Sequence, residues 1–279
     1  VFRFEELLDV IYRSRAPINE EADILRDMIP IAKERFRNSA GEASSLDMLK
    51  RDHASAFTAD TPVPYRIVDL LEMIDERIGQ LDSKEQRPHL KALRARLESL
   101  INDPRFRYMF GAKTVGDTLQ ATLSHVFRVP QDDKPICIFE MSNLPSEVVN
   151  SVVSVMCRMA FDLALSSDGA VKTLVVCEEA HRYIPTDRET GFWPTRQAIA
   201  RIAKEGRKYG VYLGVVTQRP GELDATILSQ CNTVFAMRLG NESDQQIIRK
   251  AIAGAAKSTI SFLPSIANRE CIAFGEAFR

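Results

Sequence analysis

The sequence predicts an α/β protein in which a helical first half precedes a mostly parallel sheet flanked by helices. Between residues 65 and 101, apolar residues recur at steps of three and four, which is typical of amphipathic helices. After residue 135, short β-rich runs that are apolar on both faces alternate with helical patterns, as expected for a covered parallel sheet. We therefore expect two domains, a helical region over residues 1–130 and an α/β core over residues 131–279.

The apolar periodicity places helices in the first half at Phe4–Tyr12, Asn19–Arg37, within residues 65–81 and 90–101, and at Val115–Phe127. Glu20 and Glu21 fall in the first turn of the second helix, where negative charge is favourable. The stretch TADTPVPY, residues 58–65, carries two prolines that interrupt the pattern. Long amphipathic helices joined by short links predict a bundle.

The second half contains the runs that predict strands, which are Ile136–Glu140, Leu174–Glu178, Val211–Gln218, Thr233–Leu239 and Cys271–Phe274. Helical patterns lie between them at Glu147–Leu165, Thr195–Tyr209 and near Asp224–Ser229. This alternation of strand and helix is the reason for expecting parallel pairing.

Charge and cysteine content restrict the class of protein. The 37 Lys and Arg nearly balance the 38 Asp and Glu, which argues against a broadly basic nucleic-acid coat but not against a motor that grips a few phosphates. The five cysteines are widely spaced and form no CxxC pair, so we expect neither a zinc site nor disulfides, and we expect a cytoplasmic location.

The ends of the chain and its most apolar stretch also give expectations. Arg158 and Asp162 interrupt the apolar stretch at residues 151–165, so we expect no membrane span. No signal peptide is recognisable. The chain begins at Val1 rather than at a methionine, and we expect it to be a piece of a longer protein.

Two adjacent acids end the strand in TLVVCEEAHRYIP, residues 173–185. Ligands collect at the carboxyl ends of parallel strands, so Glu178 and Glu179 would lie at a binding edge. An apolar strand followed by two acids is the pattern of a Walker B strand, in which the first acid holds Mg²⁺ through water and the second orients or deprotonates the attacking water. A divalent cation would relieve the repulsion between the two carboxylates.

Other interpretations of these residues remain open. Paired acids also suit the first turn of a helix that begins at a solvated strand end. The run ICIFE, which ends at Glu140, is a competing Walker B strand with a single acid. His181 follows the two acids, and a single histidine there is more often a structural hydrogen-bonding group than a catalytic one.

Two further motifs complete the candidate site. The strand in VYLGVVTQRP ends near Gln218, whose amide is placed to sense the γ-phosphate and to hold water; an ordinary strand-end turn is the alternative. The helix in ARIAKEGRKYG carries Arg207 and Arg201, which are candidates for an arginine finger that reaches a neighbouring subunit. Basic residues at a helix end also simply complement the helix dipole.

These motifs together resemble the HerA branch of the HerA/FtsK superfamily, whose members are ring-forming, RecA-like ATPases that pump double-stranded DNA. They occur in the order IFEMSNLPSEVVNSVVSVMCRMAFDLAL, LVVCEEAHRYIP and IAKEGRKYGVYLGVVTQRPGELDATILSQCNTVFAMRL. The resemblance implies that ATP and Mg²⁺ are bound. It also implies that Glu178 is the magnesium-side acid, Glu179 the catalytic glutamate and Gln218 the sensor. Arg207 would act in trans, with Arg201 nearby.

The same resemblance implies a RecA-like sheet with the helical bundle inserted into it. It further implies a homohexamer with ATP between subunits, double-stranded DNA in the central channel, and a nuclease or other effector as partner. Arg182 and Arg188 would approach the DNA phosphates. Trp193, beside them, is either part of this loop or a packing anchor.

One family feature is missing. The sequence contains no GxxxxGK[S/T] loop, and GAKTVGDT, residues 111–118, has the wrong order. We therefore expect that loop to lie upstream and the isolated chain to bind ATP poorly and to be inactive. Two other functions stay open, namely a conjugation or type IV secretion ATPase and a nucleotide-binding ring scaffold for an effector enzyme.

Overall fold

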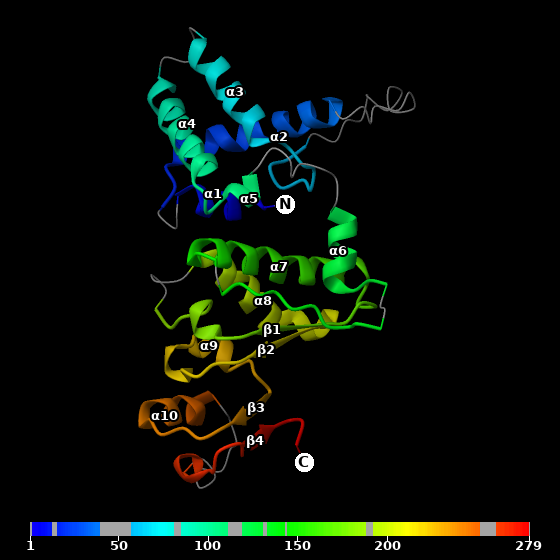
Figure 1. Ribbon diagram of the computed structural model, residues 1–279, viewed down its shortest axis with the longest axis vertical. Coiled ribbons are helices and arrows are strands. Elements are labelled where there is room, and N and C mark those ends of the chain that lie inside the picture. Colours follow the sequence, from blue (N-terminus) through cyan, green and yellow to red (C-terminus); the bar gives the residue numbers. More distant parts are fainter. Residues whose placement is uncertain are drawn as a thin grey trace. The chain divides into compact units, whose positions relative to one another are not determined.

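The computed structural model describes residues 2–12, 16–39, 57–80, 85–110, 119–130, 133–142, 144–187, 192–251 and 261–278 (Figure 1). The chain separates into two compact units, residues 1–152 and 153–279. The domain boundary expected near residue 130 stays a prediction.

In the first unit, the described secondary structure before residue 146 consists of helices. They are α1 (Phe4–Tyr12), α2 (Asn19–Ser39), α3 (Ile67–Gly79), α4 (Arg87–Asn102), α5 (Arg107–Phe110) and α6 (Leu119–Phe127). The apolar faces of α1 to α5 share one core in which Leu25, Ile74 and Leu93 are fully buried. The apolar periodicity therefore predicted these helices, apart from the short α5. The expected start of the last one, at Val115, lies outside the described residues.

Buried polar groups add specific links within this unit. Glu21 on α2 is 1% exposed; it accepts a 2.6 Å hydrogen bond from Tyr12 Oη of α1 and lies 3.2 Å from Arg96 Nε of α4. Lys33 Nζ donates to the backbone carbonyls of Thr58, Ala59 and Thr61 at 2.6–3.2 Å. These bonds hold the proline-containing segment against α2, and burial lowers the pKa of Lys33 to about 8.

The second unit is built on a parallel strand pair. The helix α7 (Ser146–Ser166) leads into it, followed by β1 (Thr173–Cys177), α8 (Trp193–Tyr209) and β2 (Val211–Val215). The strands β1 and β2 pair in parallel from Thr173↔Val211 to Cys177↔Val215, and α8 packs against β2 (Figure 1). This is the strand–helix–strand unit that the alternating pattern predicted, and it establishes the α/β class.

The remaining strands form a separate antiparallel pair. They are β3 (Thr233–Ala236) and β4 (Ile272–Gly275), and α9 (Ala225–Leu228) and α10 (Glu242–Ala251) are nearby in the chain. The expectation of a mostly parallel sheet is therefore correct for β1 and β2 and wrong for this pair, since sequence runs do not determine strand direction. The helix α10 was not expected.

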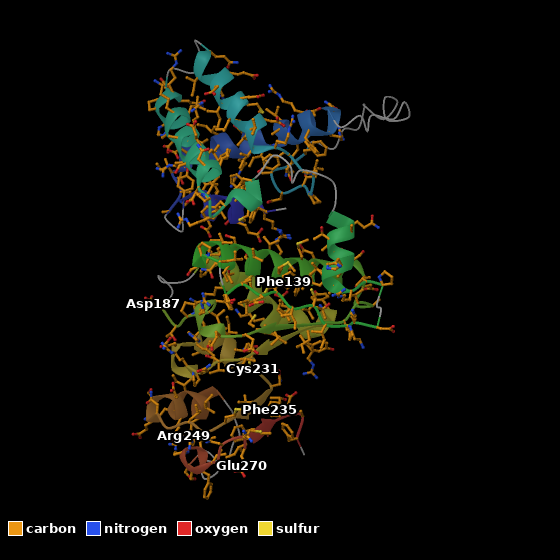
Figure 2. All side chains as sticks on the ribbon, viewed as in Figure 1. Phe139, Asp187, Cys231, Phe235, Arg249 and Glu270 are labelled. Carbon is orange, nitrogen blue, oxygen red and sulfur yellow. The ribbon has the colours of Figure 1, made fainter. Side chains whose placement is uncertain are left out.

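The run Ile136–Glu140 was expected to be a strand, and the structure has none there. Ile136 is 74% exposed, Ile138 is 85% exposed, and Phe139, labelled in Figure 2, is 45% exposed. The apolar pattern gives a propensity, but a strand also requires a hydrogen-bonded neighbour, and none of the described strands pairs with this run.

By length and composition alone, one described helix, α7 over Val148–Ser166, is apolar enough to cross a membrane. The two charges within it were expected to exclude this, and they do not. Half of that stretch is buried inside the protein. Arg158 Nη1 and Asp162 Oδ2 lie 3.2 Å apart, so the two charges form a pair one helical turn apart.

Candidate active site

The end of β1 forms a sharp, hydrogen-bonded turn that presents the two acids. Val216 donates its N–H to the carbonyl of Cys177, and the N–H of Ala180 returns to the carbonyl of Val216, both at 3.0 Å. Glu178 and Glu179 lie between these two bonds. Glu179 has φ 50° and ψ 47°, in the left-handed region, which costs a non-glycine residue about 1–2 kcal/mol.

A short 3₁₀ helix, η4 (Ala180–Arg182), begins directly after this turn. The N–H of Arg182 bonds to the carbonyl of Glu179 at 2.9 Å. The strained backbone is thus fixed by β2 on one side and by η4 on the other, so the direction of the Glu179 side chain is determined by main-chain bonds.

Side chains from the two neighbouring strand ends meet at this turn. Gln218 Nε2 donates to Glu179 Oε1 at 2.8 Å. His181 Nδ1 lies 3.2 Å from Thr217 Oγ1 and 3.4 Å from Glu179 Oε2. The structure therefore brings Glu179 and Gln218 together. It adds His181, for which the sequence favoured a structural hydrogen-bonding role, and Thr217, to which the sequence gave no role.

The exposure of these groups suits a site that receives a ligand. The side chain of Glu179 is 40% exposed, whereas that of His181 is 17% exposed. Glu178, the preceding residue, is exposed. A carboxylate held at one oxygen by an amide, and still open to solvent, can accept a proton from a water molecule.

The residues present fit a magnesium ion carried by a nucleotide better than a resident metal. No group of three or more His, Cys, Asp or Glu residues that could hold a metal ion occurs in the described part of the chain. Mg²⁺ commonly keeps several waters and takes one or two carboxylates together with substrate phosphates. Glu178, exposed beside Glu179, can fill that role, and the backbone cradle for the phosphates would require a GxxxxGK[S/T] loop that this sequence lacks.

The two candidate arginines of α8 make contacts away from Glu179. The guanidinium of Arg201 lies over the ring of Phe161, 4.1 Å from its centroid, and 4.0 Å from Glu205. Arg207 is 79% exposed, and its Nη1 lies 3.5 Å from Glu276 Oε2. Arg201 is thus packed against its own chain, and Arg207 projects into solvent.

The candidate DNA contacts are only partly described. Arg182 is exposed on η4, one residue after His181. Arg188 lies outside the described residues, which end in this loop at Asp187, labelled in Figure 2. Trp193, at the start of α8, is 51% exposed.

A buried ion pair links α8 and α9 to the segment that follows η4. Asp224 is 4% exposed and pairs with Arg196 of α8. Its Oδ1 caps α9 by accepting from the N–H groups of Thr226 and Ile227 at 2.8 and 3.2 Å, and its own N–H bonds to the carbonyl of Ile184 at 2.9 Å. Aspartate directly before a helical run signals such a cap, but its pairing with Arg196 could not be predicted from the sequence.

The last residue of β1 is buried against α7. Cys177, the last strand residue, is buried beside Cys157 of α7. The hydrogen bond between the two thiols, together with burial, raises the pKa of Cys157 well above its usual value. Both cysteines are free.

Acids and an amide at the ends of neighbouring parallel strands place this protein among the α/β proteins that bind ligands at that edge. The sequence pattern of the family described as "Helicase HerA, central domain" matches residues 1–160. The chain belongs to this family, and the resemblance to HerA-like ATPases of the HerA/FtsK superfamily is confirmed.

The names of individual relatives agree with this family assignment. A probable helicase of Methanocaldococcus jannaschii is 40% identical over 107 residues, which is 38% of this chain and 20% of the relative. The DNA double-strand break repair helicase HerA of Pyrococcus furiosus is 38% identical over 110 residues, which is 39% of this chain and 19% of the relative. HerA of Sulfolobus acidocaldarius is 28% identical over 174 residues, which is 60% of this chain and 34% of the relative. The chain therefore spans no more than about a third of the length of these relatives.

Proposed function

We propose that this chain carries the hydrolytic half of the ATP site of a DNA translocase or helicase, with a RecA-like core and an inserted helical bundle. The observation that carries the proposal is the 2.8 Å bond between Gln218 Nε2 and Glu179 Oε1 at the ends of two parallel strands. In this proposal Glu179 accepts the proton of the attacking water, and Gln218 responds to the γ-phosphate.

Glu178 acts on the magnesium side, through a water molecule. The exposure of its side chain supports this role. ATP and Mg²⁺ are the implied substrate and ion. A GxxxxGK[S/T] loop would cradle the phosphates.

Arg207 completes the site of a neighbouring subunit in a homohexamer. Its side chain is 79% exposed and its partner Glu276 is 67% exposed, and an exposed ion pair at 3.5 Å is worth less than about 1 kcal/mol. Arg207 therefore loses little free energy when it leaves Glu276 to contact a phosphate. Arg201 is the less suitable candidate, because its guanidinium is stacked on Phe161.

Double-stranded DNA is the proposed track, since the relatives with assigned roles are named DNA double-strand break repair helicases. Arg182 and Arg188 are the proposed phosphate contacts, and a nuclease or another effector is the proposed partner.

The test is the rate of ATP hydrolysis by the full-length protein with linear double-stranded DNA, with single-stranded DNA and without DNA. Stimulation of several-fold by linear duplex supports the translocase. A rate indifferent to DNA would favour a nucleotide-binding scaffold. Stimulation only by single strands would favour a conjugation or secretion ATPase.

A further inference from the structure

We propose that His181 is a positioning residue for Glu179, which it fixes to the end of β2 through Thr217. The inference rests on the proposed function, because it assigns a task to a residue around the proposed catalytic base.

The two oxygens of the Glu179 carboxylate have different partners. Oε1 accepts the 2.8 Å bond from Gln218, and Oε2 faces His181 Nδ1 at 3.4 Å. A base that is held at only one oxygen can still rotate about its terminal bond. The second contact removes that freedom and leaves a single orientation of the carboxylate.

His181 is itself fixed. Its Nδ1 lies 3.2 Å from Thr217 Oγ1, and the same hydroxyl oxygen accepts the N–H of Arg219 at 3.0 Å. The ring is only 17% exposed, and it stands on η4, whose first residue is bonded to the carbonyl of Val216. The imidazole is thus tied to β2 by main chain and by side chain.

With the proton on Nδ1, the imidazole N–H faces both Thr217 Oγ1 and Glu179 Oε2. This tautomer lets one donor serve the anchor and the base together. The arrangement matters most when Gln218 turns from Glu179 toward a nucleotide, because His181 is then the remaining side chain among the described contacts that holds the carboxylate.

The histidine is therefore expected to affect the chemical step and not ATP binding. In the full-length protein, His181→Ala should lower the kcat for DNA-stimulated ATP hydrolysis by about tenfold to a hundredfold, while the KM for ATP changes by less than about twofold. His181→Asn, whose side-chain N–H occupies nearly the place of Nδ1–H, should restore a substantial part of that loss. Thr217→Val, which keeps the shape and removes the hydroxyl, should give a smaller loss of kcat in the same direction.

A matched control is His125→Ala on α6, an exposed histidine of the other unit, which should leave kcat unchanged. A double variant gives the sharpest test. Adding His181→Ala to Glu179→Gln should cause no further loss, because a positioning residue has no effect once its base is gone. Thermal unfolding of each variant shows whether folding is retained.

Two results would overturn the proposal. One is a kcat of His181→Ala within twofold of the wild type. The other is a loss of kcat that His181→Asn does not rescue and that parallels a lower melting temperature. The proposed function is tested separately by Glu179→Gln: if that variant is inactive and His181→Ala is normal, only the positioning role is wrong.

Discussion

Gln218 and Glu179 lie 39 residues apart in the chain, yet the amide of one donates a 2.8 Å hydrogen bond to the carboxylate of the other. Parallel pairing of β1 and β2 accounts for this contact, because it brings both carboxyl ends to the same edge of the sheet. Thr217 and Gln218 follow shortly after β2, and one contacts His181 while the other contacts Glu179 directly.

Replacing Glu179 by Gln should remove ATP turnover without removing ATP binding. The amide keeps the size and hydrogen-bonding capacity of the side chain, but it cannot accept a proton from water. We expect kcat of the full-length protein to fall by about a hundredfold or more. Hydrolysis assays and binding of a fluorescent nucleotide analogue check the two parts separately.

Glu140→Gln is the matched control, since Glu140 ends the other run with a Walker B pattern. Its carboxylate is exposed and accepts from Ser142 Oγ at 3.3 Å. Normal turnover is expected for this variant. If Glu140→Gln were the inactive one, the assignment of the base to Glu179 would be wrong.

Arg207→Ala and Glu179→Gln should complement each other when the two variants are mixed. Each alone should be inactive, since a finger arginine is worth about a thousandfold or more. In rings assembled from equal amounts, about a quarter of the head-to-tail interfaces would combine an intact Glu179 with an intact Arg207. Recovery of hydrolysis after mixing is the expected result.

Lys208→Ala, which removes the next cation on the same helix, should behave as the wild type with or without mixing. Absence of any recovery in the Arg207 mixture would show that this arginine does not act across subunits. A defect in Arg201→Ala that is accompanied by lower stability would fit its position over Phe161.

The sequence predicted what depends on local pattern. Helix α2 and helix α4 follow from apolar residues repeating at three and four positions, and the parallel pair follows from a strand–helix–strand order. The proximity of Glu179 and Gln218 follows from that pairing, whereas their catalytic roles remain predictions.

Other features depend on partners that are distant in the chain. The antiparallel pairing of β3 with β4 and the absence of a strand at Ile136–Glu140 are set by which segments meet, not by the composition of either run. The position of His181 follows from the left-handed turn at Glu179. Residue preferences do not predict this turn, because glutamate rarely adopts that conformation.

Removing one partner of the buried pair of Asp224 and Arg196 should strongly destabilise the second unit. Asp224→Ala leaves Arg196 buried without its carboxylate and uncaps α9, so we expect the free energy of unfolding to fall by about 3–5 kcal/mol. Urea unfolding followed by circular dichroism measures this loss. Glu222→Ala breaks the exposed 2.9 Å pair with Arg219 and should cost less than about 1 kcal/mol. If the two variants lost equal free energy of unfolding, burial would not be what makes the loss of Asp224 more costly than the loss of Glu222.

Asp9 on α1 should make the first unit less stable as pH rises through the weakly acidic range. Burial, and secondarily the charge of Glu5, raise the pKa of Asp9 from 3.8 to about 6. The folded state then binds more protons than the unfolded chain between those two values, so ionisation of Asp9 weakens folding as pH rises from about 4 to about 6. Asp9→Asn removes this penalty. We expect it to raise the free energy of unfolding by about 1 kcal/mol at pH 7, after allowance for partial exposure, and to have little effect near pH 4.

Urea unfolding of the Asp9→Asn variant at several pH values measures this gain, and Asp27→Asn, at an exposed position on α2, is the matched control. A gain that is the same at pH 4 and pH 7 would mean that the substitution acts through packing and not through the charge. A loss at pH 7 would mean that the Asp9 carboxylate stabilises α1, against the direction of its pKa shift.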